Sequence, residues 1–317
     1  MTNQTFNRLI NNEIFTRLTW LRFIGFEFWM VGFTPFFIGY VVSSKELYSF
    51  DLFYGFLIIA ILTSSTFVLN HICDIELDKK NPRKEFSLLV RGSVSLKTSW
   101  ILFWILQLSC IILSLRFNLE FLYCILGLTA ISFAYNMEPF RFKSRPGLDL
   151  VSNGLSLGLL IPLAAWSIDQ PLLEFPKLFF LSTICYLLAL YCPTMAIDVE
   201  FDKSFGIQTF ATKFGAEFTM KLSWFFTICG VSILLISGYF EIYPWNFNLL
   251  IWTGWLLIIE NFVHYFYLPI TPNPTYNVVA KGSIILATFE AAATFIFLII
   301  FLTVSYTHLT LPTISDV

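Results

Sequence analysis

The amino-acid sequence predicts an all-α membrane protein built as a single bundle of about nine transmembrane helices. Hydrophobic residues make up 57% of the 317 residues, charged residues make up 13%, and the mean hydropathy is +0.74. Soluble proteins carry about 25% charged residues. In addition, apolar runs recur that reach the ~20 residues needed to cross a bilayer core. A soluble domain is therefore excluded, and the expected surroundings are the lipid bilayer, with no nucleic acid as a partner.

Nine apolar runs follow one another along the chain and define the predicted helices. They lie near residues 18–42, 50–72, 98–116, 118–135, 148–168, 176–197, 219–240, 246–268 and 279–303. The polar segment before the first run is too hydrophilic for a signal peptide, so we expect an uncleaved first helix. Residues 1–303 form one membrane domain in this interpretation. Residues 304–317, VSYTHLTLPTISDV, resemble a translated sequencing adapter, and we expect this tail to be non-native.

Lysine and arginine indicate the orientation of the bundle. If the N-terminus lies in the cytoplasm, all of the 19 cationic residues except Lys45, Arg116 and Lys177 fall on the inner side. Cytoplasmic loops of membrane proteins carry such an excess of cations. We therefore predict a cytoplasmic N-terminus, a prokaryotic plasma (inner) membrane as the location, and an active site at the cytoplasmic side of the bundle.

An acidic motif ends the second predicted helix. The segment NHICDIELD places Asn70, Asp74 and Asp78 at positions i, i+4 and i+8, which share one face of an α-helix. Two carboxylates and an amide oxygen are hard ligands of the kind that Mg²⁺ prefers. For a single motif of this kind, a solvated helix end with scattered charges is the favoured interpretation.

A second copy of the pattern favours the metal interpretation. Asp198 and Asp202 stand at i and i+4 where the sixth predicted helix ends, and the predicted topology brings both motifs to the same membrane surface. We therefore expect a facing pair of Mg²⁺ sites that hold a polyphosphate. In the eighth predicted helix, Glu260 and His264 are also i, i+4. They either pair with each other, since ionisable groups are costly in a bilayer, or line the cavity and accept a proton.

Cations suited to a diphosphate follow the fourth predicted helix. Arg141, Lys143 and Arg145 occupy alternate positions, so an extended segment would point all three in the same direction. Lys203, which follows the second acidic motif, is a further candidate. The alternative is that these residues only anchor the cytoplasmic side of the bundle.

These motifs resemble those of the UbiA-type intramembrane prenyltransferases. The first family motif reads Asn, Asp, two residues, Asp, three residues, Asp, and this chain matches it except that His71 replaces the first aspartate. The second motif, two aspartates followed by Gly and Thr, is matched by Asp198, Asp202, Gly206 and Thr209. The loop YNMEPFRFKSRPGLDLVSN is most similar to the branch that contains lycopene elongases.

The resemblance implies transfer of a prenyl group from a prenyl diphosphate to a lipophilic acceptor. Mg²⁺ would be held by Asn70, Asp74, Asp78, Asp198 and Asp202, and the diphosphate by Arg141, Lys143, Arg145 and Lys203. A carotenoid or other polyene acceptor such as lycopene is expected ahead of an aromatic precursor of quinones or chlorophylls. A function of another class, an ion or solute transporter that uses the acidic columns, stays open. No feature of the sequence selects an oligomeric state.

Overall fold

The computed structural model describes residues 19–44, 49–81, 84 and 87–239, and these residues form helices and no strand. The elements are η1 (Phe26–Phe28), α3 (Trp29–Ser44), α4 (Phe50–Cys73), α5 (Ile75–Asp78), α6 (Leu96–Ser114), α7 (Leu119–Asn136), η3 (Phe142–Ser144), α8 (Leu148–Leu155), η4 (Ser156–Leu160), α9 (Ile161–Trp166), η5 (Leu172–Glu174), α10 (Lys177–Ser204), α11 (Phe210–Phe214) and α12 (Ala216–Tyr239). The all-α fold class is therefore confirmed for this part of the chain.

Among the described residues, four helical segments are long and apolar enough to cross a membrane. They are Phe50–Cys73, Leu96–Ser114, Leu119–Asn136 and Leu148–Trp166, and α10 adds a fifth if its two bent parts count as one span. The eighth and ninth predicted runs, 246–268 and 279–303, lie outside the described residues, as does the tail 304–317. The predicted total of nine helices and the cytoplasmic orientation therefore stay predictions.

The first predicted helix differs from the expected continuous span. A turn at Gly25 interrupts the run 18–42, and α3 begins only at Trp29. Gly25 has a φ of +65°, and a Cβ added there would lie 2.5 Å from the Phe67 side chain. The left-handed backbone and the close contact both require glycine at this position. The apolar pattern of the run does not reveal this break.

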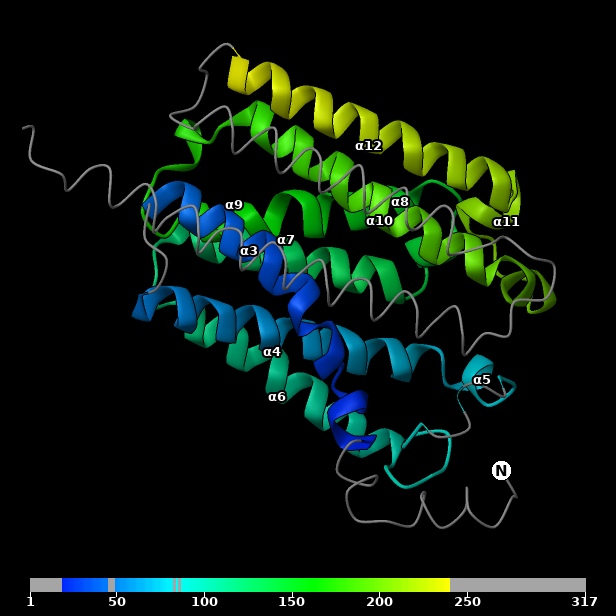
Figure 1. The fold of residues 1–317 in the computed structure, drawn as a ribbon. Helices are drawn as coiled ribbons and strands as arrows, with labels where there is room; N and C mark the ends of the chain where they lie inside the picture. Colours follow the sequence, from blue (N-terminus) through cyan, green and yellow to red (C-terminus); the bar gives the residue numbers. More distant parts are fainter. Residues whose placement is uncertain (1–18, 45–48, 82–83, 85–86, 240–317) are drawn as a thin grey trace, which may run out of the picture.

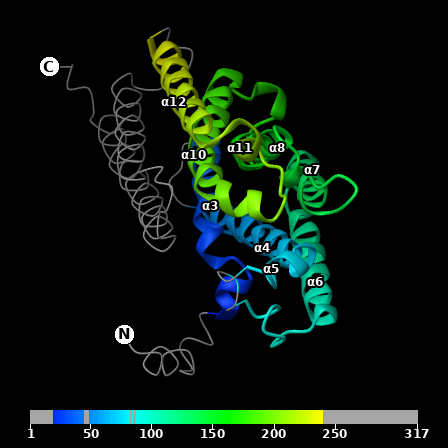
Figure 2. The same cartoon turned by 90° about the vertical axis from the view of Figure 1, so that its right-hand side faces the viewer.

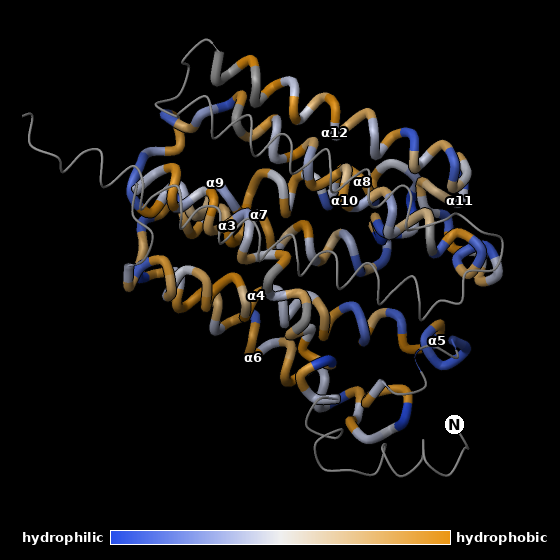
Figure 3. Tube along the Cα trace, viewed as in Figure 1, coloured by the Kyte–Doolittle hydropathy of each residue, from blue (hydrophilic) through white to orange (hydrophobic). Residues whose placement is uncertain are grey.

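The helices pack as a layered bundle in which α4 lies along α6, α10 lies along α12, and α3 contacts both α4 and α9 (Figure 1). A central core joins α3, α4, α7 and α9, and its fully buried side chains include Phe36, Ile58, Phe121 and Ile125. Apolar residues run along the helices, whereas hydrophilic residues gather around α5 (Figure 3). The apolar surface that remains exposed on such helices suits contact with lipid.

A proline shapes α10 and the position of its C-terminal end. Pro193 lies inside the helix and has no N–H to bond the carbonyl of Ala189, four residues earlier. Ser223 of α12 donates a 2.6 Å hydrogen bond to that carbonyl instead. One turn beyond the proline the helix bends by 57°, between Phe180–Ala196 and Asp198–Ser204. The second acidic motif therefore lies on a short helical leg of its own.

The same arrangement recurs where α10 meets the π-helical turn η4. Pro162 cannot bond the carbonyl of Gly158, and Thr183 of α10 donates a 2.7 Å hydrogen bond to it. A Cβ on Gly158 would lie 2.7 Å from Ile184 Cα, so glycine permits α10 to pack directly on this turn. A π-helical turn next to a proline is a common site of local rearrangement in a helix.

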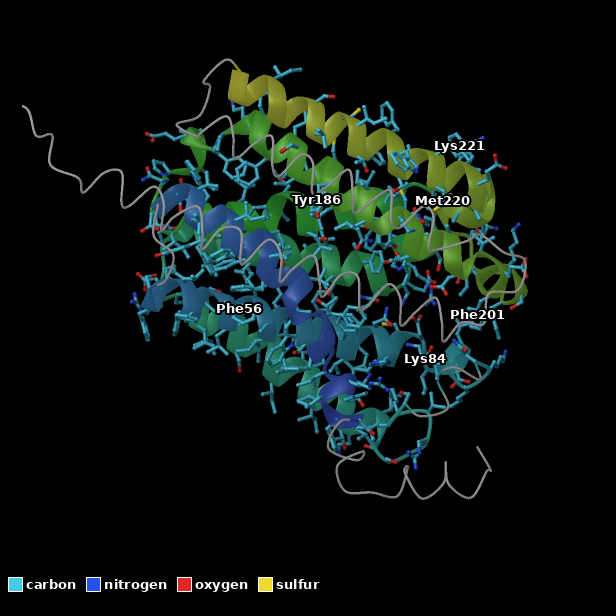
Figure 4. All side chains as sticks on the ribbon, viewed as in Figure 1. Phe56, Lys84, Tyr186, Phe201, Met220 and Lys221 are labelled. Carbon is cyan, nitrogen blue, oxygen red and sulfur yellow. The ribbon has the colours of Figure 1, made fainter. Side chains whose placement is uncertain are left out.

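Both acidic motifs lie at the same end of the bundle. In Figure 1, α5, the C-terminal part of α10 and α11 are all at the right-hand end, which faces the viewer in Figure 2. Side chains from both regions are labelled there: Lys84 follows α5, and Phe201 lies in the second leg of α10 (Figure 4). The topology thus brings together two motifs that are more than a hundred residues apart in the sequence.

Candidate functional site

Asp74 is bonded to two cations from the loop that follows α7. Its Oδ1 accepts a 2.8 Å hydrogen bond from Arg141 Nη2, and its Oδ2 accepts a 2.6 Å hydrogen bond from Lys143 Nζ. The side chains of Asp74, Arg141 and Lys143 are 17%, 18% and 11% exposed. Charges that are this shielded from water interact more strongly than surface pairs. The three residues are therefore a tightly associated charged cluster at the end of α4.

The loop that carries these cations is not extended. Arg141 has a φ of +37°, in the left-handed region, and η3 turns immediately after it. This turn brings Arg141 and Lys143 onto the same carboxylate, whereas Arg145 donates a hydrogen bond to the carbonyl of Pro139 and is exposed. The prediction that three alternate cations point in one direction is therefore wrong, because it assumed a strand-like backbone.

Lys143 lies in a partly desolvated position beside Asp74. Burial lowers the pKa of its ammonium group, and the adjacent Asp74 carboxylate counteracts this effect. A second acceptor, the amide oxygen of Asn136, lies 3.1 Å from Nζ. Desolvation disfavours a charged lysine and an opposite charge favours it, so Asp74 is the principal group that opposes the effect of burial here.

The helical pattern of the first acidic motif continues through a break at Asp74. α4 ends at Cys73 and α5 begins at Ile75, yet the N–H of Asp78 still donates to the carbonyl of Asp74 at 2.7 Å. Asn70, Asp74 and Asp78 thus follow the predicted spacing of one turn each. Asn70 reaches back into the bundle, where its Nδ2 donates to Asn136 at 3.1 Å.

Asp78 lies beside His71, the residue that departs from the family motif. His71 Nδ1 is 3.7 Å from Asp78 Oδ2, and the imidazole stacks on Phe23 with a centroid distance of 5.3 Å. Both atoms are buried, and neither has a hydrogen-bond partner among the described residues. Buried polar atoms without partners are uncommon in folded proteins, and Asp78 Oδ2 retains the capacity to accept a hydrogen bond or to bind a cation.

The second acidic motif is held by the loop that leads into α11. Thr209 caps α11 through its side chain, and its Oγ1 lies 3.5 Å from Asp202 Oδ2. The N–H of Ile207 donates to the carbonyl of Asp202, and Gly206 permits this turn with a φ of +69°. The Gly and Thr of the motif thus have direct structural roles. Lys203, by contrast, is exposed.

Asp149 anchors this loop and was not among the predicted site residues. It is fully buried at the start of α8. Its carboxylate accepts hydrogen bonds from the backbone N–H groups of Gly147, Leu150 and Phe210, at 2.7, 2.9 and 2.6 Å. Since Phe210 is the first residue of α11, Asp149 joins the starts of two helices. An acidic residue within an apolar run was the available sequence signal.

Two tyrosines lie between the acidic motifs. The hydroxyl oxygens of Tyr135, in α7, and Tyr191, in α10, are 3.0 Å apart. Tyr135 is within electrostatic range of Asp74, and Tyr191 is within range of Asp202. Their half-buried rings therefore occupy the interior between the two motifs.

The four aspartates of the predicted site lie at one end of the bundle without forming a single cluster. Within the described ranges, no three His, Cys, Asp or Glu side chains are close enough together to hold a metal ion. The donor set nevertheless fits a hard divalent cation, because it consists of carboxylate and amide oxygens and includes the unpartnered Asp78 Oδ2. Glu260 and His264 lie outside the described residues.

Comparison with known proteins identifies the family. The profile of the UbiA prenyltransferase family matches residues 32–285, a range that includes both acidic motifs and the basic loop. The chain belongs to the UbiA prenyltransferase family. The resemblance predicted from the motifs is thereby confirmed at the level of the family, and the branch that contains lycopene elongases is not singled out.

The UbiA chain is similar to several curated relatives. A 2-acylphloroglucinol 4-prenyltransferase of Humulus lupulus is 26% identical over 212 residues, which cover 62% of this chain and 48% of the relative. A 4-hydroxybenzoate octaprenyltransferase of Francisella tularensis subsp. novicida is 29% identical over 203 residues, 63% of this chain and 68% of the relative. The chain thus spans about half the length of the plant relative that it matches.

A solved structure shares the UbiA fold. The structure of a UbiA homologue from Archaeoglobus fulgidus, bound to GPP and Mg²⁺, superposes with a TM-score of 0.71 at 21% sequence identity, and the match covers 88% of this chain and 99% of that chain. At this identity the similarity establishes the fold alone.

Proposed function

We propose that this protein is a Mg²⁺-dependent intramembrane prenyltransferase, which transfers the prenyl group of a prenyl diphosphate to a lipophilic acceptor. We also propose that it works at the cytoplasmic side of a prokaryotic plasma membrane. Membership of the UbiA family supports this activity. The metal and the diphosphate are the ligands in the structure of the Archaeoglobus homologue, which is bound to GPP and Mg²⁺.

The observation that carries the proposal is the pairing of Asp74 with Arg141 and Lys143. A carboxylate suited to a metal and two cations suited to a diphosphate are in contact in one partly buried place. A metal diphosphate brings complementary charges to both partners: the metal binds the carboxylate, and the phosphate oxygens bind the cations. Such a ligand replaces the internal ion pairs without leaving either kind of charge unpaired.

The residues have distinct roles in this mechanism. Asn70, Asp74, Asp78, Asp198 and Asp202 would hold Mg²⁺, which supplies neutralisation of the diphosphate charge when bound. Arg141 and Lys143 would donate to the phosphate oxygens as the C–O bond breaks and its electron pair passes to diphosphate. A carbon of the acceptor then forms a bond to the prenyl carbon, and the cationic adduct that results loses a proton. The rings of Tyr135 and Tyr191 would stabilise the allylic cation through their faces.

For the acceptor we propose a polyene, with an aromatic compound as the second candidate. Apart from Lys84, Arg141 and Lys143, the cations within the described part of the chain are exposed, and the last two contact Asp74. A carboxylate-bearing acceptor needs a cationic partner inside the site, whereas a polyene does not. The name of the Francisella relative, 4-hydroxybenzoate octaprenyltransferase, favours the aromatic candidate.

A transporter is less consistent with this arrangement. Transporters commonly place their binding sites near the midplane of the membrane, between repeats and interrupted helices. Here the acidic motifs are at one end of the bundle, next to a basic loop (Figures 1 and 2). An enzyme that receives a charged diphosphate at the membrane surface and an apolar chain from the bilayer fits that position.

One experiment tests both the reaction and the acceptor. Membranes that contain the protein would be incubated with labelled prenyl diphosphates, Mg²⁺, and either lycopene or 4-hydroxybenzoate. The proposal predicts labelled product from lycopene. Efficient labelling of 4-hydroxybenzoate alone would overturn the polyene acceptor and retain the reaction. Absence of product with every acceptor, together with transport of an ion or solute, would reject the enzyme.

A further inference from the structure

Asn136 occupies a central place among the proposed ligand-binding residues, and no motif assigns it a role. It is the last residue of α7 and is fully buried. Its Oδ1 accepts two hydrogen bonds, one from Asn70 Nδ2 and one from Lys143 Nζ, both at 3.1 Å. One amide oxygen thus contacts a residue proposed to bind the metal and a residue proposed to bind the diphosphate.

The partners determine how the Asn136 amide is oriented. Lys143 can only donate, so it must face the oxygen, and the carbonyl of Ser132 can only accept, so it must face the nitrogen. Nδ2 donates to that carbonyl at 3.0 Å. An amide flipped by 180° would lose both of these bonds. The orientation of Asn136 therefore follows from the chemistry of its neighbours.

This orientation determines that of Asn70 in turn. Because Asn136 presents an oxygen, Asn70 must direct its Nδ2 towards it. The Oδ1 of Asn70 is then not engaged by Asn136, and it accepts no hydrogen bond from any residue that the structure describes. Only the oxygen of an asparagine side chain can bind a cation such as Mg²⁺, so this orientation leaves the ligand atom of Asn70 available.

Lys143 is oriented by the same oxygen. Its ammonium group has three N–H donors; one contacts Asp74 at 2.6 Å and one contacts Asn136 at 3.1 Å. Two fixed contacts leave the third N–H with a defined direction, available to a phosphate oxygen. When a metal replaces the cations on Asp74, the bond to Asn136 would keep Lys143 in the site.

We propose that Asn136 is a positioning residue that orients Asn70 towards the metal and Lys143 towards the diphosphate. This inference rests on the proposed function, because it needs both ligands to bind here. It goes beyond that function by assigning the orientation of two ligand-binding side chains to a residue that contacts neither ligand. Residues that orient metal ligands in this indirect way typically change metal affinity roughly 10- to 100-fold when they are removed.

The test measures Mn²⁺ binding, in place of Mg²⁺, by electron paramagnetic resonance on the purified full-length protein. A prenyl thiodiphosphate whose C–S bond resists cleavage is present, so the readout does not depend on activity. The variants are Asn136→Leu, Asn70→Ala and the double variant. Gln107→Leu is the matched control, because Gln107 is an equally buried amide that joins Ser65 of α4 to Thr129 of α7.

We expect Asn136→Leu to weaken Mn²⁺ binding by roughly 10- to 100-fold and Gln107→Leu to leave it within about twofold of wild type. In the Asn70→Ala background, Asn136→Leu should lower Mn²⁺ affinity little further, because Asn136 acts on the metal through Asn70. Unchanged Mn²⁺ affinity in Asn136→Leu would overturn the inference. So would an equal loss of affinity in both backgrounds, which indicates a general structural effect.

Two further outcomes are distinguishable from these. If wild type itself binds no Mn²⁺ in the presence of the analogue, the proposed function fails, and the positioning role fails with it. If Asn136→Leu does not fold, Asn136→Ser takes its place in the same comparison, because it is smaller and its hydroxyl cannot bridge Asn70 and Lys143. Asn136→Leu should also lower the affinity for the thiodiphosphate analogue. This loss should be small in a Lys143→Met background, because Asn136 acts on the diphosphate through Lys143.

Discussion

The Lys143 ammonium nitrogen lies 2.6 Å from Asp74 Oδ2, although 69 residues separate the two in the sequence. Arg141 contacts the other oxygen of the same carboxylate. The basic loop is thus in direct contact with the first acidic motif. In the proposed reaction cycle, binding of a metal diphosphate exchanges these internal contacts for contacts with the ligand.

Lys143 and Arg145 should differ sharply despite their similar place in the sequence. Lys143→Met retains the apolar stem and removes the donor to Asp74 and Asn136. The Michaelis constant for prenyl diphosphate should therefore rise roughly 10-fold or more, because a hydrogen bond to a charged group contributes about 1.5–3 kcal/mol. Arg145→Gln should change it less than about threefold, because Arg145 is exposed and bonds the Pro139 carbonyl. Steady-state kinetics with labelled substrate measures both.

Lys79→Met is the control for this comparison, because Lys79 is exposed and pairs only with Glu76 among the contacts described for it. Its Michaelis constant should match wild type. Equal effects of Lys143→Met and Lys79→Met would return Lys143 to the role of a topological anchor.

Asp149 should contribute to stability and to the geometry of the second motif. Asp149→Ala leaves three backbone N–H groups without their acceptor in a buried place. We expect the free energy of unfolding to fall by about 3–5 kcal/mol, because each hydrogen bond to a charged acceptor contributes roughly 1.5–3 kcal/mol and partial relaxation recovers some of the loss. Thermal unfolding in detergent should show a clearly lower midpoint. Asp51→Ala, which removes an exposed carboxylate paired with Arg116, should shift the midpoint only slightly; a similar shift in both variants contradicts this role.

Ser223 should stabilise the bend of α10 through the carbonyl that Pro193 leaves unpaired. Ser223→Ala should destabilise the protein by about 1–3 kcal/mol, the cost of a buried acceptor without a donor. In a Pro193→Ala background the cost should be smaller, because the restored N–H can bond the Ala189 carbonyl itself. Thr227→Val is the matched control, since its hydroxyl bonds a carbonyl of its own helix. Equal costs of Ser223→Ala in both backgrounds would exclude this explanation of the bend.

The sequence predicted the membrane helices because bilayer thickness and hydropathy act on each run separately. Six predicted helices correspond closely to helical segments between residues 49 and 239, and the first predicted run contains α3 after the break at Gly25. The break at Gly25 was missed because it depends on the contact with Phe67. The bend of α10 was also missed, although Pro193 within an apolar run indicated where the helix could be distorted.

The part of the candidate site that depends on the spacing of residues along one helix could be predicted from the sequence. The aspartates of both motifs could be found because carboxylates at i and i+4 share a helical face. The left-handed conformation of Arg141 directs Arg141 and Lys143 towards Asp74 and leaves Arg145 outside the site. The alternate spacing of these cations in the sequence did not indicate that conformation. Asn136 and Asp149 were missed because their partners come from other elements, and only the folded chain brings them together.

The central claim is that the two acidic motifs bind the metal diphosphate, and one measurement tests it most directly. Prenyl transfer from a labelled prenyl diphosphate would be followed in purified wild type, Asp74→Asn, Asp198→Asn and Asp51→Asn, with Mg²⁺ present or removed by EDTA. Asparagine retains the size of each side chain, and Asp51, whose Oδ1 lies 2.8 Å from Arg116 at the opposite end of α4, is a matched ion-paired control. We predict that Asp74→Asn and Asp198→Asn lose turnover by at least about 100-fold, that Asp51→Asn retains it, and that EDTA abolishes wild-type turnover until Mg²⁺ is restored. Full turnover in folded Asp74→Asn or Asp198→Asn, or in the presence of EDTA, would contradict the account.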